Sequence, residues 1–293
     1  MKILVVGDFQ GKFPEKLKKK LKKEEFDLVI GVGDYSGLDD FRPWIMKRMK
    51  LAKEGKEAPS IEEMMGKKKF NELLKKDFER GKNVLKEINS LGKGKEVIFV
   101  FGNSDEGWYK SHFDKKEVLE KKKANFIKKM KKMKNITYGK TSLNGFDFIG
   151  FGGYMDIDVY FNKNKFKDAK DGEILESRID RRAKSRKNLF NRLKISRNKN
   201  KVFVFHYPPK SVFDIIRGGK GNPMNGKSAG IKFFREAIIK YKPKLVLCGH
   251  MHEYQGMKKL YGVPIINPGD AGEGKYAIVE LINNKINSVR FEK

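Results

Sequence analysis

The sequence predicts an α/β fold in a single domain, and three observations support this prediction. Short apolar runs rich in valine, isoleucine and phenylalanine alternate along the chain with longer, lysine-rich stretches of helical periodicity. Hydrophobic residues form 39% of the 293 residues, which is enough to build a sizeable buried core. Polar residues flanked by glycine or proline follow several of the apolar runs, where α/β sheets place their ligand sites.

Nine apolar runs are predicted to be β-strands, because each is short and rich in β-branched or aromatic residues. The last three are separated only by turn-like pieces such as Asn283-Asn284, which predicts an antiparallel end to the sheet. The predicted strands span residues 3–6, 28–32, 97–101, 146–151, 202–205, 245–248, 263–266, 276–281 and 286–291.

The stretches between the strands contain five predicted helices, over residues 17–23, 60–90, 117–133, 173–195 and 228–241. The second begins with a capping box, in which the Ser60 side chain accepts from the backbone of Glu63 and the Glu63 side chain reaches back. This helix ends near Gly92. Gly66 and Gly81 lie inside it and lower its intrinsic helical stability.

The domain organisation follows from where strands are missing. Residues 39–92 contain no strand set of their own and have no flanking proline-rich or serine-rich linker. We therefore interpret them as a helical insertion between two core strands. A second, basic excursion spans about residues 154–200. We expect one domain over residues 1–293, with these two excursions.

The charge balance suggests an anionic partner. Lysine and arginine number 66 against 37 aspartates and glutamates, which gives a net charge of +29. Such a field attracts phosphates, so a nucleic acid is a candidate partner through the basic surface. The alternative is that lysine enrichment reflects overall composition or a hot habitat. The candidate contact regions are residues 115–134 and the helix face that carries Arg178, Arg182 and Arg186.

The same helix has an apolar stripe that is expected to pack on the core, formed by Leu175, Ile179, Ala183, Phe190 and Leu193.

The sequence argues against several classes of protein. No apolar run reaches the roughly 18 residues that a membrane span needs, and the apolar run at the N-terminus is too short for a signal peptide. Cys248 is the single cysteine, so a disulfide within this chain and a cysteine-based zinc cluster are both excluded. We expect a cytoplasmic protein, and the sequence leaves its oligomeric state open.

Seven polar residues follow predicted strands and form a mixed set of imidazole and oxygen donors. Three of the four histidines in the chain belong to this set, two of them with H-x-H spacing. Seven donors are too many for one four-coordinate zinc but suit two divalent ions that share a carboxylate. Two ions about 3.5–4 Å apart are a recurring device for phosphoester hydrolysis. The seven residues are Asp8, Gln10, Asp34, Asn103, His206, His250 and His252.

Five short motifs occur in order along the chain: D-x-Q, G-D, G-N-S-D, H-Y-P-P and G-H-M-H. Their order and spacing resemble the calcineurin-like metallophosphoesterase superfamily, and within it the small phosphoesterases related to the cyclic-AMP phosphodiesterase branch. Residues 149–153 resemble the glycine-rich strand of that branch, 244–250 its last catalytic strand and 266–272 its N-P-G-S-x-G turn. The resemblance covers the chain apart from the basic excursions.

The resemblance implies a four-layer α/β/β/α metallophosphoesterase sandwich with basic helical insertions. It also implies two divalent ions, drawn from Mn, Fe, Zn or Ni with Mn favoured, and a metal-bridging hydroxide as the nucleophile. Asp34, Asn103 and His206 correspond to the catalytic residues. The first ion would be held by Asp8, Gln10 and His252, the second by Asn103, His206 and His250, and both by the bridging Asp34.

Two positions depart from the family pattern. Gln10 stands where the family usually has histidine, and its neutral amide oxygen is a weaker donor, which favours a harder ion such as Mn²⁺. Ser104 stands where many members have the histidine of G-N-H-D, so protonation of the leaving group falls to water or another residue. Ser104 and Arg217, the latter in the glycine-rich loop after Pro208-Pro209, are the candidate substrate contacts.

Two functions of different classes stay open at this point. The first is a metal-dependent phosphoesterase that hydrolyses phosphoester bonds, with a phosphodiester as the favoured substrate. The second is a nucleic-acid-binding protein whose metal site is weakened by Gln10, and a nuclease would combine both. His112 matches no motif and is interpreted as a surface or packing residue.

Overall fold

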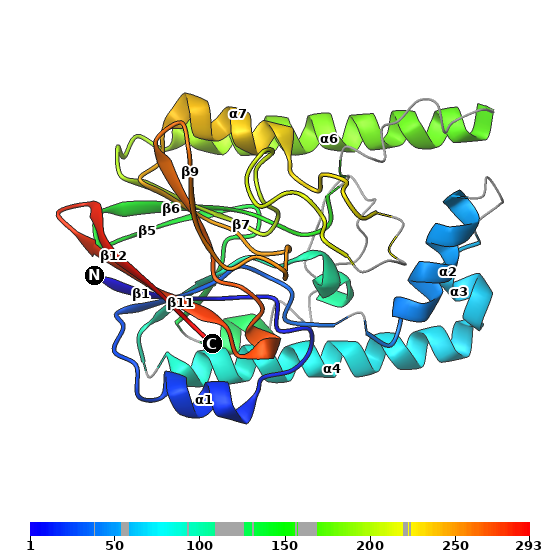
Figure 1. Ribbon diagram of the computed structural model, residues 1–293, viewed down its shortest axis with the longest axis horizontal. Coiled ribbons are helices and arrows are strands. Elements are labelled where there is room, and N and C mark those ends of the chain that lie inside the picture. The colour runs from blue at the N-terminus through cyan, green and yellow to red at the C-terminus, as the bar shows by residue number, and fades with distance from the viewer. Residues whose placement is uncertain are drawn as a thin grey trace.

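The fold consists of two six-stranded sheets that lie face to face between layers of helices (Figure 1). A computed structural model describes residues 1–37, 39–53, 59–92, 94–108, 126–130, 132–155, 157, 169–218, 222 and 224–293. The predicted helix over residues 117–133 and the cationic segment 115–134 lie mostly outside these residues, and His112 lies wholly outside them.

The first sheet has the strand order β12-β11-β1-β2-β3-β4. Strands β1 to β4 of this sheet run parallel to one another, and β11 and β12 extend the sheet as antiparallel strands. The bounds are β1 Lys2–Val6, β2 Leu28–Gly31, β3 Glu96–Phe99, β4 Met133–Asn135, β11 Tyr276–Ile282 and β12 Lys285–Glu292.

The second sheet has the order β5-β6-β7-β8-β10-β9. Strands β6, β7, β8 and β10 are parallel, and the edge strands β5 and β9 are antiparallel to their neighbours. The bounds are β5 Lys140–Leu143, β6 Phe146–Phe151, β7 Lys201–Phe205, β8 Leu245–Leu247, β9 Gly256–Leu260 and β10 Val263–Asn267.

Three separate hydrophobic cores show that the molecule has four layers. Because successive strand side chains point to opposite faces, Ile3 and Val5 of β1 enter the core between the sheets, whereas Leu4 and Val6 enter an outer core. Helices α1 (Glu15–Leu21) and α4 (Lys67–Leu91) cover that outer face, and α6 (Ala169–Ile195) and α7 (Lys232–Tyr241) cover the outer face of the second sheet (Figure 1). The α/β/β/α sandwich is therefore confirmed.

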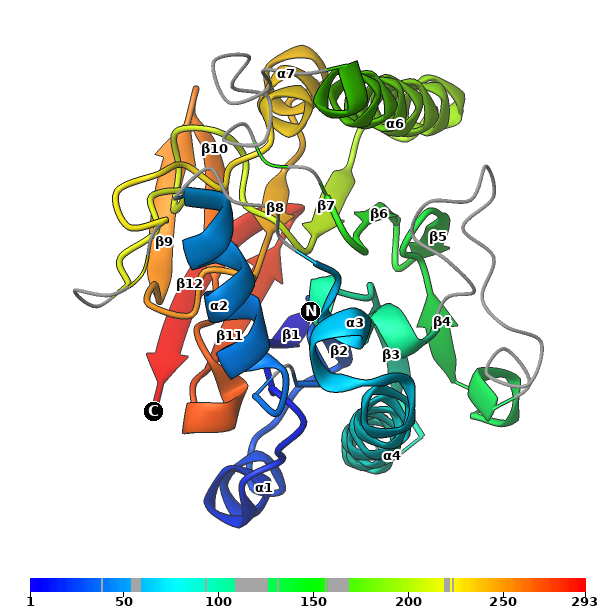
Figure 2. The same cartoon turned by 90° about the vertical axis from the view of Figure 1, so that its right-hand side faces the viewer.

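One part of the insertion between β2 and β3 packs on the core, and the other part projects beyond the sheets. Helices α2 (Arg42–Lys53) and α3 (Ile61–Met65) lie beyond the end of the sheets, whereas the C-terminal half of α4 packs on the first sheet through Val84, Leu85 and Ile88 (Figures 1 and 2). The capping box at Ser60 is confirmed, but the single long helix is wrong. Gly66 has a φ of 85° and separates α3 from α4.

Two further expectations need correction. Of the last three predicted strands, β11 and β12 pair in the first sheet, but β10 belongs to the second sheet, where β8 and β9 flank it. Among the residues of the predicted apolar stripe of α6 whose burial the structure describes, those towards the C-terminal end are the more buried, because the other half of the helix projects past the sheets (Figure 1). Leu193 is 1% exposed, whereas Ile179 is 45% exposed.

The parallel strands place their C-terminal ends at one end of the sandwich. Strands β1, β2 and β3 of the first sheet and β7 and β8 of the second all lead into glycine-containing loops there. This is the edge at which α/β sheets form ligand sites. Among the described residues, no helix has both the length and the apolar character needed to cross a membrane.

Candidate metal centre

The loops after β1, β2 and β8 hold four of the predicted ligands in a strained backbone conformation. Asp8, Gln10, Asp34 and His250 have φ values of 56°, 49°, 56° and 69°, a left-handed region that residues other than glycine rarely adopt. Each such residue costs about 1–3 kcal/mol and persists only where the surrounding structure fixes it. Strain of this kind gathers at functional sites, so the clustering marks this end of the sheets as one.

Two glycines allow the loops of the two sheets to approach each other closely. A Cβ atom on Gly102 would lie 2.1 Å from Oδ1 of Asp34 in the same sheet and 2.6 Å from Cε1 of His206 in the other, and one on Gly33 would lie 2.6 Å from Nδ1 of His206. Gly33 also has a φ of 105°. The glycines of the G-D and G-N-S-D motifs are therefore required because the site is built by close packing of loops.

One half of the site gathers around Asn103. The Nδ1 atom of His206 lies 2.8 Å from the carbonyl oxygen of Val32, to which it must donate, so its Nε2 atom carries a lone pair. That lone pair faces Oδ1 of Asn103 at 2.9 Å and Oδ1 of Asp34 at 3.4 Å. Nδ1 of His250 lies 2.7 Å from the same Asn103 oxygen. Electron-pair donors therefore converge on one point.

The other half gathers around His252. Its Nε2 atom lies 3.6 Å from Oδ1 of Asp8 and 3.2 Å from Nε2 of Gln10, which also lies 3.2 Å from Oδ2 of Asp34. The amide nitrogen of Gln10 thus faces the cluster, and Gln10 can act as a ligand only after its amide turns over to present the oxygen. Both oxygens of Asp8 accept from the backbone N–H of His250 at 3.0 Å.

The two halves share one carboxylate. Ligand atoms of Asp34, His206 and His250 lie within 4.8 Å of one another, and so do those of Asp8, Asp34 and His252. Sequence positions up to 244 residues apart, from Asp8 to His252, are thereby brought together. All seven predicted ligands lie in or directly beside these two groups.

The electrostatics of the site fit a bound cation. Burial, reinforced by the neighbouring Asp34, raises the pKa of Asp8 well above its usual range. Burial also lowers the pKa of His206, and burial together with His206 lowers the pKa of His250. Neutral imidazoles are the form that binds metal, and a divalent ion would stabilise the buried carboxylate charges. The donor set and its environment therefore suit divalent metals.

A buried aspartate that the sequence analysis did not single out holds the Asp34 loop in place. Asp105 is 0% exposed, and its carboxylate accepts from the backbone N–H groups of Asp34, Ser36 and Gly102 at 3.0, 2.9 and 2.7 Å. Its position as the last residue of G-N-S-D was the available signal. Asp270 was also missed, although it stands where the family turn has serine, and its Oδ2 lies 3.7 Å from Nδ1 of His252.

The sequence matches a known family of enzymes. The calcineurin-like phosphoesterase family matches residues 1–254. This chain belongs to that family. Membership implies metal-dependent hydrolysis of a phosphoester, with divalent metal ions as cofactors.

Relatives of this calcineurin-like phosphoesterase agree in sequence and fold. Protein MJ1162 of Methanocaldococcus jannaschii is 26% identical over 197 residues, which cover 65% of this chain and 72% of that protein. One solved structure covers 100% of this chain and 98% of its own at 19% identity, with a TM-score of 0.66. The structure of TT1561 of Thermus thermophilus covers 99% of this chain and 97% of its own at 16% identity, with a TM-score of 0.50. The solved structures share the fold of this phosphoesterase.

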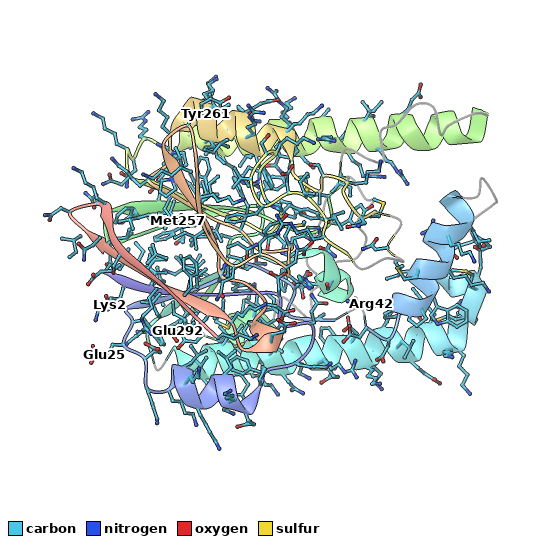
Figure 3. The ribbon with its side chains drawn as sticks, in the orientation of Figure 1. Lys2, Glu25, Arg42, Met257, Tyr261 and Glu292 are labelled. Carbon is cyan, nitrogen blue, oxygen red and sulfur yellow. The ribbon has the colours of Figure 1, made fainter. Side chains whose placement is uncertain are left out.

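A pocket of about 660 Å³ opens beside the cluster of candidate ligands in this phosphoesterase. The residues that line it include His250, His252 and Gln10 of the cluster, together with Arg217 and Arg42. Arg42 begins α2, at the end of the molecule opposite Lys2 and Glu25 (Figure 3). Ser104 is 2% exposed and is not among the described lining residues; its backbone N–H donates to Oδ1 of Asp34 at 2.8 Å. Of the two predicted substrate contacts, the structure places Arg217 at the pocket.

The arginines of α6 do not form a uniform free face. Nε of Arg186 donates to Oε2 of Glu236 in α7 at 2.8 Å, and the Arg186 guanidinium lies 4.7 Å from the ring centroid of Phe190. Arg178 and Arg182 also have interaction partners. At least Arg186 therefore contributes to packing α6 on α7, and a nucleic-acid contact through these arginines stays a prediction.

A second buried carboxylate supports the loop that carries Asp34. Asp77 in α4 is 6% exposed, and its Oδ1 accepts from the backbone N–H of Gly37 at 2.7 Å. Burial raises the pKa of Asp77 to about 7. Between about pH 4 and that value the folded state keeps a proton that the unfolded state has released, so this group makes stability fall as pH rises through the window.

We expect Asp77→Asn to remove this pH dependence, because the amide oxygen still accepts from Gly37 but no longer titrates. Urea unfolding of both proteins at pH 4.5 and 7.5 measures the effect. The difference in free energy of unfolding, variant minus wild type, should be larger at pH 7.5 than at pH 4.5. We expect this increase to be at least about 1.4 kcal/mol, the equivalent of one pKa unit. An equal difference at both pH values would show that Asp77 is ionised throughout.

Proposed function

We propose that this phosphoesterase is a binuclear, metal-dependent phosphodiesterase. The observation that carries the proposal is that Asp34 belongs to two groups of converging ligand atoms, one with His206 and His250 and one with Asp8 and His252. A carboxylate shared by two groups is what a pair of neighbouring ions requires. The fit of neutral imidazoles and buried carboxylates to cations supports the same assignment.

In this proposal each ion has four protein ligands, with Asp34 common to both. Two bound ions supply an activated water and neutralise negative charge on the phosphoryl oxygens. Mn²⁺ is the favoured ion among Mn, Fe, Zn and Ni, because oxygen donors outnumber imidazoles in the first group. The first group is Asp8, Gln10, Asp34 and His252, and the second is Asp34, Asn103, His206 and His250.

Contacts within the chain hold the proposed ligands in position in this site. The Val32 carbonyl fixes the His206 proton on Nδ1, and the buried Asp105 fixes the backbone of Asp34. Both contacts hold ligand atoms in place before substrate arrives, which is where much of the catalytic advantage of an enzyme lies. In this proposal Arg217, which lines the pocket and whose guanidinium lies 4.8 Å from the Tyr254 ring centroid, contacts an anionic substituent of the substrate.

The pocket is large enough for the diester that we propose as the substrate. Its volume of about 660 Å³ is within the usual range for small-molecule sites and far exceeds that of one phosphate group. A diester carries a substituent on each side of the phosphorus, and the pocket gives both substituents room beside the ligand cluster.

Hydrolysis of two chromogenic substrates tests this proposal. With Mn²⁺ added, bis(p-nitrophenyl) phosphate should be hydrolysed at least about tenfold more efficiently than p-nitrophenyl phosphate, a preference of about 1.4 kcal/mol in the transition state. A preference for the monoester would contradict the diester assignment. Inactivity on both substrates with each of the four candidate ions would contradict the assignment as a phosphoesterase of this kind.

Replacing Gln10 by histidine should tighten binding of the first ion. An imidazole is a better donor than a neutral amide oxygen for most transition ions, and we expect about a tenfold lower dissociation constant. Titration of metal-free protein with Mn²⁺ and Zn²⁺ measures this change, and the affinity for the second ion provides an internal control. If Gln10→His and wild type bind the first ion equally well, residue 10 is not a ligand.

A further inference from the structure

Asp270 faces the imidazole nitrogen of His252 that points away from the other ligands. Its Oδ2 lies 3.7 Å from Nδ1 of His252, while Nε2 of the same ring lies 3.6 Å from Asp8. At 3.7 Å the carboxylate acts on the ring through its charge rather than through a short hydrogen bond. The two ring nitrogens of His252 therefore have different surroundings, a carboxylate on one side and the ligand cluster on the other.

The surroundings of His252 define which nitrogen carries the proton. Nε2 of Gln10 can only donate, so its 3.2 Å contact requires a lone pair on Nε2 of His252 and a proton on Nδ1. A carboxylate facing Nδ1 stabilises the proton there. The same tautomer leaves Nε2 free to bind a metal, so Asp270 favours the form of His252 that the proposed site needs.

The turn that carries Asp270 is fixed to the loop that carries Asp8. Backbone N–H groups of Ala271 and Gly272 donate to the carbonyl oxygens of Gly7 and Asp8 at 3.0 and 3.4 Å. Oδ1 of Asp270 accepts from the backbone N–H of Glu273 at 3.2 Å and caps the short 3₁₀ helix Ala271–Glu273. One carboxylate oxygen thus anchors the residue, and the other faces His252.

We propose that Asp270 is a positioning residue that keeps the proton of His252 on Nδ1 and so leaves Nε2 available for the first metal ion. The inference rests on the proposed binuclear site. It explains how a site that has exchanged one imidazole for Gln10 retains a strong remaining imidazole donor. A carboxylate behind a metal-binding histidine fixes the tautomer and raises the basicity of the ligand nitrogen.

The decisive variant is Asp270→Asn. The asparagine keeps an Oδ1 that can cap Glu273, because asparagine is as good an N-cap as aspartate. Its Nδ2, however, presents a partial positive charge to Nδ1 of His252 in place of a carboxylate, so the proton is no longer stabilised on Nδ1 and Nε2–H is favoured, the wrong tautomer that an aspartate-to-asparagine change behind a catalytic histidine gives in serine proteases. We therefore expect the first ion to bind about 10–100-fold more weakly, while the second ion is little affected.

Two measurements on full-length protein test the inference. In the metal-free state, the ¹⁵N chemical shifts of the His252 ring report the tautomer, which should change from Nδ1–H to Nε2–H in Asp270→Asn. Calorimetric titration with Mn²⁺ alone then measures both affinities. Glu273→Gln is the matched control, because it removes the same charge from the same turn, where Glu273 pairs with Lys275 at 2.6 Å. It should leave the tautomer and both affinities unchanged.

The outcomes separate this inference from the proposed function. Wild-type protein that binds fewer than two ions contradicts the binuclear site itself. Wild-type protein that binds two, with an unchanged tautomer and unchanged affinities in Asp270→Asn, overturns the role of Asp270. Asp270→Ser, which keeps a capping oxygen but has no carboxylate, should weaken binding of the first ion as well. If Glu273→Gln weakens binding of the first ion as much as Asp270→Asn does, the effect is one of general charge, and the inference is also overturned.

Discussion

Asp34→Asn should abolish turnover while leaving the fold intact. The change removes a negative charge from both ligand groups at once, and it replaces one shared oxygen by an amide nitrogen that cannot bind a metal. We expect a loss of at least about a thousandfold in kcat, equivalent to ~4 kcal/mol of transition-state stabilisation. The fold should persist, because the amide oxygen of asparagine can still accept from the backbone N–H of Ser104.

Asp27→Asn is the matched control for this variant. Asp27 directly precedes β2, and Asp34 closely follows the same strand at its other end, so the two substitutions differ in position rather than chemistry. Asp27 is exposed and accepts from the backbone N–H of Lys2 at 2.7 Å. Turnover by Asp27→Asn should match that of the wild type. If Asp34→Asn retains wild-type turnover at saturating Mn²⁺, the shared carboxylate is not essential and the assignment fails.

Gly102→Ala should damage both the site and the stability of the protein. The added Cβ would lie 2.1 Å from Oδ1 of Asp34 and 2.6 Å from its backbone nitrogen, so these buried atoms must move. Overpacking of a dense interior costs about 1–3 kcal/mol. Displacing a catalytic group by about 1 Å can lower the rate by about a hundredfold. We expect both effects, measured as urea unfolding and as kcat on the chromogenic diester.

Gly139→Ala provides the comparison for this glycine. A Cβ on Gly139 would lie 3.5 Å from the nearest atom of Ile136, an ordinary van der Waals distance. The variant should therefore unfold and turn over substrate much as the wild type does. If Gly102→Ala behaves like Gly139→Ala, the loops after β2 and β3 are not packed as closely at Asp34 as the structure places them.

Local sequence patterns were sufficient to predict nine of the twelve strands in the described part of the chain, and to single out candidate ligands that the fold brings together. Each buried strand is a short apolar run that ends at a glycine or a polar residue, as in the segment from Ile3 to Asp8. Histidine is rare in this chain, so three histidines at strand ends were conspicuous. Both signals are contained in a few neighbouring residues, which is why they could be read without the fold.

The features that were missed depend on contacts between distant residues. Asp105 acts on the backbone of Asp34, 71 residues away, and its place at the end of G-N-S-D marks it in the sequence without indicating which backbone groups it binds. Strand β9, Gly256–Leu260, is an exposed edge strand whose lysines hide the usual apolar alternation. The apolar stripe of α6 has the right periodicity, but only packing decides that Ile179 projects past the sheet while Leu193 is buried.

The central claim is that one carboxylate, Asp34, joins two metal sites, and electron paramagnetic resonance with Mn²⁺ tests it most directly. Metal-free protein titrated with Mn²⁺ should bind two ions per chain and develop the spectrum of an exchange-coupled pair, because ions about 3.5–4 Å apart share a bridging ligand. Asp34→Asn should lose the coupled spectrum. A single ion per chain, or two ions whose spectra stay uncoupled in the wild type, would contradict the claim.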